Sequence, residues 1–323
     1  MTLIKSISGI RGTIGGNPNN GLTPLDVVKF TSAFGTWLKQ RNNNANTKVV
    51  IGRDARISGE MVNNLVVGSL QGLGIDVIDL ELSTTPTVEV AVPLENAQGG
   101  IIITASHNPK QWNALKLLNE KGEFISASDG AEVLSIAEND AYDYALVDDL
   151  GGYKKDNTYL EKHIKAVLNL PLVDVEAIKG ANFTIAVDAV NSTGGIFIPA
   201  LLRELGVKNI IELYCQPTGD FPHNPEPLEK HLTEIITECA SGSYDMGIVV
   251  DPDVDRLAFV DEKGKMFGEE YTLVLIADYL LENRKSNVVS NLSSSKALRD
   301  LAESKGSTYS ASAVGEVNVV NEM

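Results

Sequence analysis

Ser106 lies in a turn that places a hydroxyl group where α/β proteins bind ligands. The apolar and β-branched run Ile101–Thr104 predicts a buried strand. Pro109 cannot donate to a β-ladder and disfavours the helical conformation of Asn108, so the chain turns sharply after that strand. In open α/β sheets, ligands bind at the carboxyl ends of strands. Ser106, with His107 and Asn108 beside it, is therefore a candidate nucleophile.

The same turn has a simpler interpretation, because Ser, Asn and Pro are common in turns that do no chemistry. A Ser–His–Asp triad is not expected, since Ser106 and His107 are adjacent and their side chains diverge. The Gly-x-Ser-x-Gly elbow of α/β-hydrolases is also missing around this serine. The turn by itself therefore does not decide whether Ser106 is a nucleophile or an ordinary turn residue.

A second candidate for chemistry is the acidic loop that follows the apolar run Met246–Val250. Asp251, Asp253 and Asp255 alternate at spacing two, which places their carboxylates on one face of an extended segment. Three neighbouring carboxylates repel one another unless a cation neutralises them, and an all-oxygen ligand set favours Mg²⁺. We therefore predict a Mg²⁺ site at these three aspartates.

Three other interpretations of the acidic loop explain less. A solvated acidic turn does not account for its position directly after an apolar strand. A calcium EF-hand would place Glu262 at position 12, but position 6 is Arg256 where that loop requires glycine. An aspartate-nucleophile phosphatase, whose first strand ends in Asp-x-Asp, leaves the Ser106 turn unexplained and remains a minor alternative.

Arg11, Lys116 and Arg256 are cations that complete a set suited to phosphoryl transfer. That chemistry needs in-line positioning and charge neutralisation more than covalent chemistry by the protein. Arg256 follows the acidic loop directly, where its guanidinium can bind a phosphate through two hydrogen bonds or form an ion pair with an aspartate. The serine turn, the acidic loop and these cations together indicate phosphoryl transfer.

The composition of the chain indicates which partners it can bind and in which cellular compartment it is expected. The chain has 323 residues and a formal net charge of −16, which argues against a nucleic-acid partner and against a basic membrane-binding patch. Cys215 and Cys239 form neither a disulfide framework nor a metal-binding spacing. No apolar run approaches the roughly 18 residues of a membrane span. We expect a cytoplasmic protein with no membrane and no nucleic-acid partner.

Alternating apolar runs and amphipathic stretches predict an α/β fold of tandem domains, each a mixed, mainly parallel sheet with helices on both faces. Expected strands cover residues 48–51, 75–80, 101–104, 114–118, 183–188, 207–213, 246–250, 257–260, 287–290 and 308–310. Expected helices cover residues 24–38, 59–73, 85–94, 127–139, 153–168, 229–240, 270–283, 295–304 and 315–323, with one more ending near 205. Ser58 is expected to cap helix 59–73, and residues 7–12 to form a glycine-punctuated turn. The expected domains are 1–150, 151–260 and 261–323.

Four motifs resemble those of the α-D-phosphohexomutase family, which contains phosphoglucomutases, phosphomannomutases and phosphoglucosamine mutases. The Thr-Ala-Ser-His-Asn-Pro signature of that family corresponds to Thr104–Pro109, and its Asp-x-Asp-x-Asp-Arg loop to Asp251–Arg256. Its Ser-Gly-Ile-Arg-Gly opening corresponds to Ser8–Gly12, and Gly52–Ser58 resembles its second strand-end motif. The resemblance covers essentially the whole chain, with the two main signatures in the expected order and separation.

The resemblance implies a phosphohexose mutase that interconverts hexose 1-phosphate and hexose 6-phosphate. Ser106 would carry the phosphoryl group, while Asp251, Asp253 and Asp255 would hold one Mg²⁺ together with a phosphoserine oxygen of Ser106. The remaining implied residues are Arg11, His107 and Lys116 around the transferred group, Lys116 as a general acid or base, and Asn108 and Arg256 as phosphate-binding residues. A hexose 1,6-bisphosphate would be the intermediate and activator. The protein would bind a small phosphosugar and act as a monomer or a homodimer.

The departures from the family concern the sugar and the end of the chain. Asn113-Ala114 replaces the usual Asn-Gly. The segment Ala313–Asn318 has the family's Val-Gly but lacks the preceding lysine of many phosphogluco/phosphomannomutases, which favours phosphoglucosamine mutase. The Glu-x-Ser sugar loop and the C-terminal Arg-x-Ser-Gly-Thr phosphate loop are missing. We therefore expect an N-terminal portion of a four-domain protein, with a truncated third domain and no turnover by this chain alone. Phosphomannomutase or phosphoglucomutase activity, and a sugar-phosphate-binding relic without turnover, remain alternatives.

Overall fold

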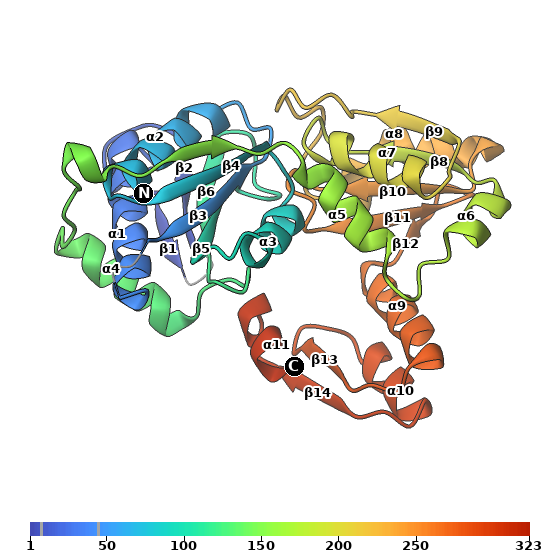
Figure 1. Cartoon of the computed structure of the whole chain (residues 1–323). Coiled ribbons are helices and arrows are strands. Elements are labelled where there is room, and N and C mark those ends of the chain that lie inside the picture. The colour runs from blue at the N-terminus through green and yellow to red at the C-terminus, as the bar shows by residue number, and fades with distance from the viewer. Residues whose placement is uncertain (7–8, 44–45) are drawn as a thin grey trace.

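The computed structural model describes residues 1–6, 9–43 and 46–323, and these form three successive α/β units (Figure 1). The first two units lie side by side, and the long helix α9 (Glu269–Asn283) leads to the third. The predicted α/β fold class with tandem mixed sheets is confirmed. The start of the predicted 7–12 turn, Ile7 and Ser8, lies outside the described residues.

Within the described residues, the first unit is built on a seven-stranded mixed sheet in the order β1-β2-β6-β5-β3-β4-β7. Its strands are β1 (Ile4–Ser6), β2 (Gly9–Thr13), β3 (Lys48–Arg53), β4 (Asp76–Leu82), β5 (Gly99–Ile103), β6 (Trp112–Leu118) and β7 (Tyr153–Lys155). β5, β3, β4 and β7 run parallel to one another, whereas β6, β2 and β1 pair antiparallel. Since parallel strands end at one edge of the sheet, the turns after β3 and β5 meet there.

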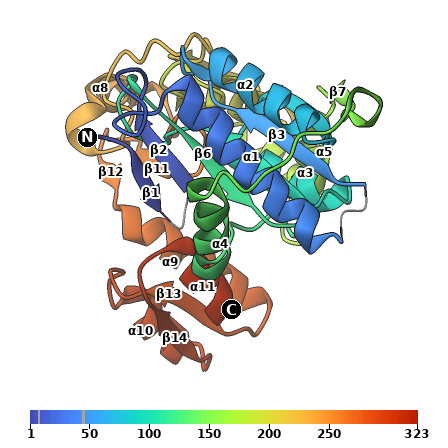
Figure 2. The ribbon, with the colours of Figure 1, turned by 90° about the vertical axis from the view of Figure 1, so that its left-hand side faces the viewer.

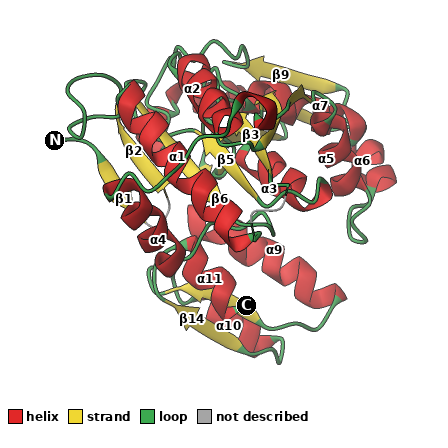
Figure 3. Ribbon diagram, turned by 60° about the vertical axis from the view of Figure 1, so that its left-hand side comes forward, coloured by secondary structure: helices red, strands yellow, loops and turns green. Residues whose placement is uncertain are grey.

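Helices cover both faces of this sheet (Figure 3). One face carries α1 (Pro24–Arg41), α2 (Gly59–Gly72) and α4 (Ala127–Glu138). The other carries α3 (Thr85–Leu94), and Tyr159, the first residue of α5 (Tyr159–Leu168), belongs to the core on that face. Along β3 the side chains alternate, so that Val49 and Ile51 are buried against the first face and Val50 against the second. Burial on both faces explains why β3 is a continuous apolar run that the sequence reveals.

The second unit contains, as far as the structure describes it, a five-stranded mixed sheet in the order β12-β11-β10-β8-β9. Its strands are β8 (Thr184–Asp188), β9 (Asn209–Leu213), β10 (Met246–Val250), β11 (Leu257–Asp261) and β12 (Met266–Phe267). Its α-helices are α6 (Val175–Ala181), α7 (Gly194–Glu204) and α8 (Thr233–Glu238). β10 is parallel to β8 and antiparallel to β11, so the chain reverses between β10 and β11. The acidic loop forms this reversal.

The third unit pairs β13 (Val288–Asn291) with β14 (Tyr309–Ser312) in parallel, next to α10 (Ala297–Ser304) and α11 (Glu316–Glu322). Helix α11 comes near the first unit (Figure 2), where Glu316 of α11 and Phe124 of the first unit line one cavity of about 240 Å³. In the part of the chain that the structure describes, no helix is long and apolar enough to cross a membrane.

Three expectations about local structure are wrong. The predicted helix 153–168 begins only at Tyr159, because Tyr153–Lys155 instead pairs with β4 as edge strand β7. The predicted turn 7–12 is, from Gly9 onward, strand β2 between β1 and β6. Ser58 occupies the N-cap position of α2, but its backbone is already helical and its side chain makes no capping hydrogen bond; its hydroxyl oxygen instead accepts from Asn113 Nδ2 at 2.9 Å.

Other boundaries agree with the sequence to different degrees. The predicted helix 85–94 is confirmed at both ends as α3, whose N-cap Thr84 accepts the N–H of Thr87. The predicted helix 229–240 is interrupted: it consists of a 3₁₀ turn at Glu229–His231, then α8, then a π-helical turn at Cys239–Ser243. The short helix α6 was not predicted. The division into domains 1–150, 151–260 and 261–323 stays a prediction.

Candidate active site

Ser106 follows β5 in a tight turn and has an uncommon backbone conformation. Its φ angle is +48°, in the left-handed region that residues with a Cβ rarely adopt. Thr104 Oγ1 accepts the backbone N–H of Ser106 at 2.9 Å, and Ser106 is buried. Backbone strain of this kind clusters at functional positions.

Asp251, Asp253 and Asp255 lie in the loop between β10 and β11, and each offers a carboxylate oxygen within 4.8 Å of the others. Asp251 and Asp253 are buried, whereas Asp255 is exposed. Asp253 Oδ1 is buried and has no hydrogen-bond partner among the described residues. An unpaired buried carboxylate oxygen beside two further carboxylates fits a divalent cation, because such an oxygen is costly to bury alone.

Ser106 and the acidic loop meet between the first and second units. The Ser106 hydroxyl donates to Asp251 Oδ2 at 2.7 Å, and Asp255 Oδ1 lies 3.3 Å from the same hydroxyl oxygen. His107 Nδ1 lies 3.2 Å from Ser106 Oγ. Residues 145 positions apart in the sequence therefore contact each other at the carboxyl ends of strands from two sheets.

Lys116 extends from β6 to two of the three aspartates. Its Nζ donates to Asp253 Oδ2 and to Asp255 Oδ2, each at 2.7 Å. Burial disfavours the ammonium form, but the two carboxylates outweigh burial and raise the pKa of Lys116 above its ordinary value. The lysine is therefore a charged partner of the acidic loop.

Burial and neighbouring charges control the protonation of the other groups. Burial, and then the charges of Asp253 and Asp255, raise the pKa of Asp251 well above its usual range. Burial also opposes ionisation of Asp253, but Lys116 outweighs it and lowers the pKa of that carboxyl. Burial lowers the pKa of His107, which favours its neutral imidazole. Because the aspartates repel one another so strongly, a cation among them would relieve the repulsion.

Arg11 and Asn108 complete the surroundings of Ser106. A cavity of about 70 Å³ is lined by Arg11, Ser106, His107, Asn108 and Lys116, with small residues between them. Arg11, on β2, is exposed, so its guanidinium is accessible to an anion. Asn108 Oδ1 is buried and lacks a hydrogen-bond partner within the described residues. The cavity thus brings these predicted site residues together.

Arg256, unlike Arg11 and Lys116, does not face the Ser106 cavity within the described lining. Its backbone N–H donates to Asp251 Oδ1 at 3.1 Å, but its guanidinium forms an ion pair with Glu226 at 3.4 Å. The guanidinium therefore pairs with Glu226 instead of an aspartate of the acidic loop.

Comparison with known proteins identifies the family. Residues 3–143, 161–264 and 268–323 match, in order, domains I, II and III described as "Phosphoglucomutase/phosphomannomutase, alpha/beta/alpha domain". The chain belongs to the phosphoglucomutase/phosphomannomutase family, the α-D-phosphohexomutases.

Individual relatives of this chain carry different names. It is 36% identical to a phosphoglucomutase/phosphomannomutase of Thermococcus kodakarensis, over 97% of this chain and 68% of the relative. It is 35% identical to a probable phosphoglucosamine mutase of Pyrococcus horikoshii, over 98% of this chain and 66% of the relative. A solved structure of a putative phosphomannomutase from Thermus thermophilus has a TM-score of 0.84 at 24% identity, covering 98% of this chain and 70% of that chain. The chain spans about two thirds of the length of these relatives.

Two residues that the sequence did not single out connect the first and second units beside the acidic loop. Thr85, the first residue of α3, donates its hydroxyl hydrogen to Asp253 Oδ2 at 2.5 Å. Ser192, in the second unit, accepts the N–H of Ala55 at 3.2 Å and donates to the carbonyl oxygen of Pro252 at 2.6 Å. No local sequence signal indicates these contacts, because each partner lies far away in the chain.

Arg56 is a third residue that was missed. It is buried below the Ser106 turn and donates to backbone carbonyl oxygens of that turn. Its segment, Gly52–Ser58, resembles a family motif, but the sequence pattern does not indicate a role for this arginine.

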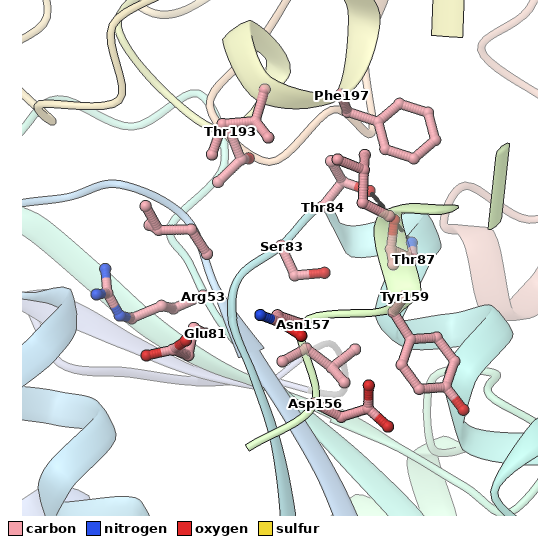
Figure 4. Close-up of a pocket in the computed structure, with 14 residues that line it drawn as sticks. Arg53, Glu81, Ser83, Thr84, Thr87, Asp156, Asn157, Tyr159, Thr193 and Phe197 are labelled. Atoms are coloured by element: carbon pink, nitrogen blue, oxygen red, sulfur yellow. Dashed lines mark hydrogen bonds between the residues drawn. The ribbon is translucent and has the colours of Figure 1, made fainter. Parts of the chain in front are cut away.

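A larger cavity lies between the first two units (Figure 4). It has a volume of about 330 Å³ and is lined from β3, β4, α3, α5 and α7. Arg53 and Glu81 lie at one end, and Thr193 and Phe197 at the other. None of the predicted site residues is among the described residues that line it. The candidate site is therefore identified by the charged groups that meet there and not by the volume of its cavity.

Proposed function

We propose that this chain performs the phosphoryl transfer of a phosphohexose mutase, with Ser106 as the residue that carries the phosphoryl group. The observation that carries the proposal is the 2.7 Å hydrogen bond from Ser106 Oγ to Asp251 Oδ2, beside a group of three carboxylates. A phosphate on Ser106 would lie next to the residues suited to hold a cation. Hexose 1-phosphate and hexose 6-phosphate interconvert if two hydroxyls of the sugar react at this serine in turn.

The transfer exchanges one P–O bond for another. In the first half, the bond between phosphorus and Ser106 Oγ breaks, a bond forms to a free hydroxyl oxygen of the sugar monophosphate, and the hydroxyl proton ends on Ser106 Oγ. The product is a hexose 1,6-bisphosphate. In the second half the other phosphate returns to Ser106, which restores phosphoserine and releases the isomeric monophosphate. Because no water takes part, a site closed to water protects phosphoserine from hydrolysis.

Asp251, Asp253 and Asp255 are the residues proposed to hold Mg²⁺, together with a phosphoserine oxygen. All of these donors are oxygen atoms, which Mg²⁺ prefers, and the unpartnered Asp253 Oδ1 is suited to a cation. Mg²⁺ supplies positive charge that neutralises the transferred phosphoryl group. Thr85 and Lys116 hold Asp253 in place from the first unit, since both donate to its Oδ2.

The residues that line the Ser106 cavity are proposed to handle the proton and the phosphate. Lys116 is the candidate general acid or base, since it lines the cavity beside Ser106, and its contacts with Asp253 and Asp255 keep it protonated. Arg11 is proposed to bind phosphate oxygens through its accessible guanidinium. His107 and Asn108 are proposed to donate further hydrogen bonds to those oxygens, since both line the cavity.

Arg256 is proposed as a ligand of phosphoserine or of the sugar phosphate. Its backbone N–H contacts Asp251, so its position follows the acidic loop. Binding a phosphate requires its guanidinium to leave Glu226. A dianionic phosphate that accepts two parallel hydrogen bonds is a stronger partner than one carboxylate at 3.4 Å.

Glucosamine phosphate is the proposed sugar. The segment Ala313–Asn318 resembles that of phosphoglucosamine mutases, and the relative of Pyrococcus horikoshii is named a probable phosphoglucosamine mutase. The relative of Thermococcus kodakarensis is named phosphoglucomutase/phosphomannomutase, so glucose and mannose phosphates are the alternatives.

The 323-residue chain is proposed to accept a phosphoryl group without completing the interconversion by itself. A hexose bisphosphate has an anionic group at each end. Among the described residues that line the Ser106 cavity, the cations are Arg11 and Lys116, which together serve one phosphate. A distal phosphate that the cations of this cavity do not reach contributes no binding energy there to position the reacting end.

Phosphorylation of Ser106 tests the proposal. The chain is incubated with Mg²⁺ and the 1,6-bisphosphate of glucosamine, glucose or mannose, and the phosphate is located by intact mass and peptide mapping. We expect phosphate on Ser106, formed fastest from the glucosamine compound. Phosphate on Asp251 or Asp253 would instead support an aspartate-nucleophile phosphatase. Tight sugar-phosphate binding with no covalent phosphate would support a binding protein without turnover.

A further inference from the structure

We propose that Arg56 is a positioning residue that holds the Ser106 turn in its left-handed conformation, with the Ser106 hydroxyl facing the acidic loop. The inference rests on the proposed function of Ser106 as the phosphoryl carrier. Arg56 is only 1% exposed and is not part of the described lining of the Ser106 cavity. It therefore acts on the chemistry through the turn and not through the substrate.

All five N–H donors of the Arg56 guanidinium have acceptors. Nε donates to Asp54 Oδ2 at 3.0 Å. The other four donate to backbone carbonyl oxygens of the turn, namely Pro109 at 2.8 Å and Trp112 at 3.1 Å from Nη1, and Asn108 at 2.6 Å and Ser106 from Nη2. A planar fork of five donors is peculiar to arginine, so lysine cannot bind these carbonyls together.

Asp54 fixes the arginine and also reaches Ser106 from the other side. Its Oδ1 accepts the backbone N–H of Arg56 at 3.0 Å, and its Oδ2 accepts the hydroxyl hydrogen of Thr104 at 2.7 Å. Thr104 Oγ1 in turn accepts the N–H of Ser106 at 2.9 Å. Both polar backbone groups of Ser106 are thus connected to one buried ion pair.

Arg56, Asp54 and Thr104 form a clamp on the Ser106 turn, and this clamp accounts for the strained backbone conformation of Ser106. A residue with a Cβ at a φ of +48° persists there only when its surroundings over-determine it. The Asp54–Arg56 ion pair is buried on both sides, with no exposed side-chain surface, so it is held rigidly. Without the clamp the turn relaxes toward negative φ. The hydroxyl then leaves its position 2.7 Å from Asp251 Oδ2.

Arg56 also contacts the second unit, to which the acidic loop belongs. Its guanidinium carbon lies 5.1 Å from the centre of the Phe221 ring. Beside it, Gly219 approaches Ala55 so closely that a Cβ at Gly219 would lie 1.9 Å from the Ala55 carbonyl oxygen. A clamp that touches both units keeps the Ser106 turn aligned with the acidic loop.

The test compares Arg56→Lys with the matched control Arg53→Lys. Arg56→Lys keeps a positive charge beside Asp54 but loses the planar fork. In the described residues the Arg53 guanidinium makes one hydrogen bond, to the Asp54 carbonyl oxygen at 3.3 Å, and none to the Ser106 turn. For each protein we measure the rate of Ser106 phosphorylation against hexose bisphosphate concentration with Mg²⁺. Hydrogen–deuterium exchange of residues 104–112 is measured on the same samples.

We expect Arg56→Lys to lower the maximal phosphorylation rate by roughly 10²-fold, because the hydroxyl is misplaced. The half-saturating bisphosphate concentration changes by less than about threefold, since the groups that bind the substrate are untouched. Exchange rises in residues 104–112 and stays unchanged elsewhere, and Arg53→Lys alters neither quantity. A folded Arg56→Lys protein with the wild-type rate, or with unchanged exchange in this segment, overturns the proposal.

Thr104→Val is the second variant, used if Arg56→Lys does not fold. It removes the acceptor of the Ser106 N–H and leaves both charges of the ion pair in place, so the maximal rate falls and exchange in residues 104–112 rises. Wild-type values in a folded Thr104→Val protein overturn the proposal as well. If the wild-type chain takes no phosphate on Ser106, the proposed function fails, and the exchange measurement still decides whether Arg56 holds the turn.

Discussion

Thr85 of the first unit makes two hydrogen bonds to Asp253 of the second. Its hydroxyl donates to Asp253 Oδ2 at 2.5 Å, and its backbone N–H donates to the Asp253 carbonyl oxygen at 2.8 Å. The two residues are 168 positions apart in the sequence. Thr85 is also the first residue of α3, whose N-terminal end favours a negative charge. The position of the acidic loop therefore depends on the first unit, which also carries Ser106.

Removing this contact should loosen the acidic loop. Thr85→Val leaves Asp253 Oδ2 without one of its donors, so we expect the free energy of unfolding to fall by about 1–2 kcal/mol and Mg²⁺ affinity to decrease. Thr31→Val is the matched control, because Thr31 Oγ1 is buried and has no hydrogen-bond partner among the described residues. The control should be neutral or stabilising in the same denaturant titration. Equal losses in both variants would contradict a specific role of the Thr85 contact.

Mg²⁺ binding should depend on Asp253. Asp253→Asn removes the charge from the carboxylate whose Oδ1 is unpartnered within the described residues, and we expect the affinity to fall about tenfold or more, roughly 1.4 kcal/mol. Isothermal titration calorimetry measures this directly. Glu262→Gln removes the same charge from an exposed residue beyond β11 and should leave the affinity unchanged. Wild-type affinity in Asp253→Asn would place the cation elsewhere.

Two substitutions of Ser106 distinguish the role of its hydroxyl in phosphorylation from the stability cost of its left-handed backbone conformation. Ser106→Ala and Ser106→Gly should both abolish phosphorylation by a hexose bisphosphate, since each lacks the hydroxyl. Glycine adopts a φ of +48° without the strain that alanine retains, so Ser106→Gly should be more stable than Ser106→Ala by about 1 kcal/mol. Intact mass and thermal unfolding measure the two effects. Phosphate retained in either variant would refute the assignment of Ser106.

His223 lies between β9 and the 3₁₀ turn at Glu229–His231, and both of its ring nitrogens contact acceptors. Nε2 lies 3.0 Å from Asp188 Oδ2, and Nδ1 lies 2.9 Å from the Asn224 carbonyl oxygen. Because both partners are acceptors, both nitrogens can donate only when the imidazole is protonated. Burial disfavours that form, but Asp188 outweighs burial, and Glu234 adds to it, so the pKa of His223 is raised above its ordinary value. Stabilisation from this group is complete below the unfolded pKa of about 6.5 and is lost as pH rises through the folded value.

The stability difference between wild type and His223→Gln should therefore shrink with rising pH. We expect roughly 1.5–3 kcal/mol below about pH 6, as for a hydrogen bond to a charged group, and little above the folded pKa. Denaturant unfolding across this pH range measures it. His231→Gln is the control, because the described residues show no hydrogen bond or ion pair from its ring. A difference that grows with pH would reverse the assigned protonation.

The sequence by itself determined the buried strands, several helices and the loops that carry Ser106 and the three aspartates. β5 and β10 are apolar because they are buried between helical layers, so their composition reveals them. The sequence also predicted that Ser106 and Asp251 follow such strands, and both do. The start of helix 85–94 could be predicted because its N-cap, Thr84, is a local signal.

Tertiary structure decided the edge strands and the meeting of the two loops. Tyr153–Lys155 is exposed along its whole length, and it becomes a strand only because β4 offers an unpaired edge. Gly9–Thr13 becomes a strand, and presents Arg11, because β1 and β6 lie on either side of it. The contacts of Ser106 with Asp251 depend on how two separate sheets pack together, so no local pattern encodes them. The Arg56 clamp was equally hidden, because its acceptors are backbone carbonyls, which every residue has.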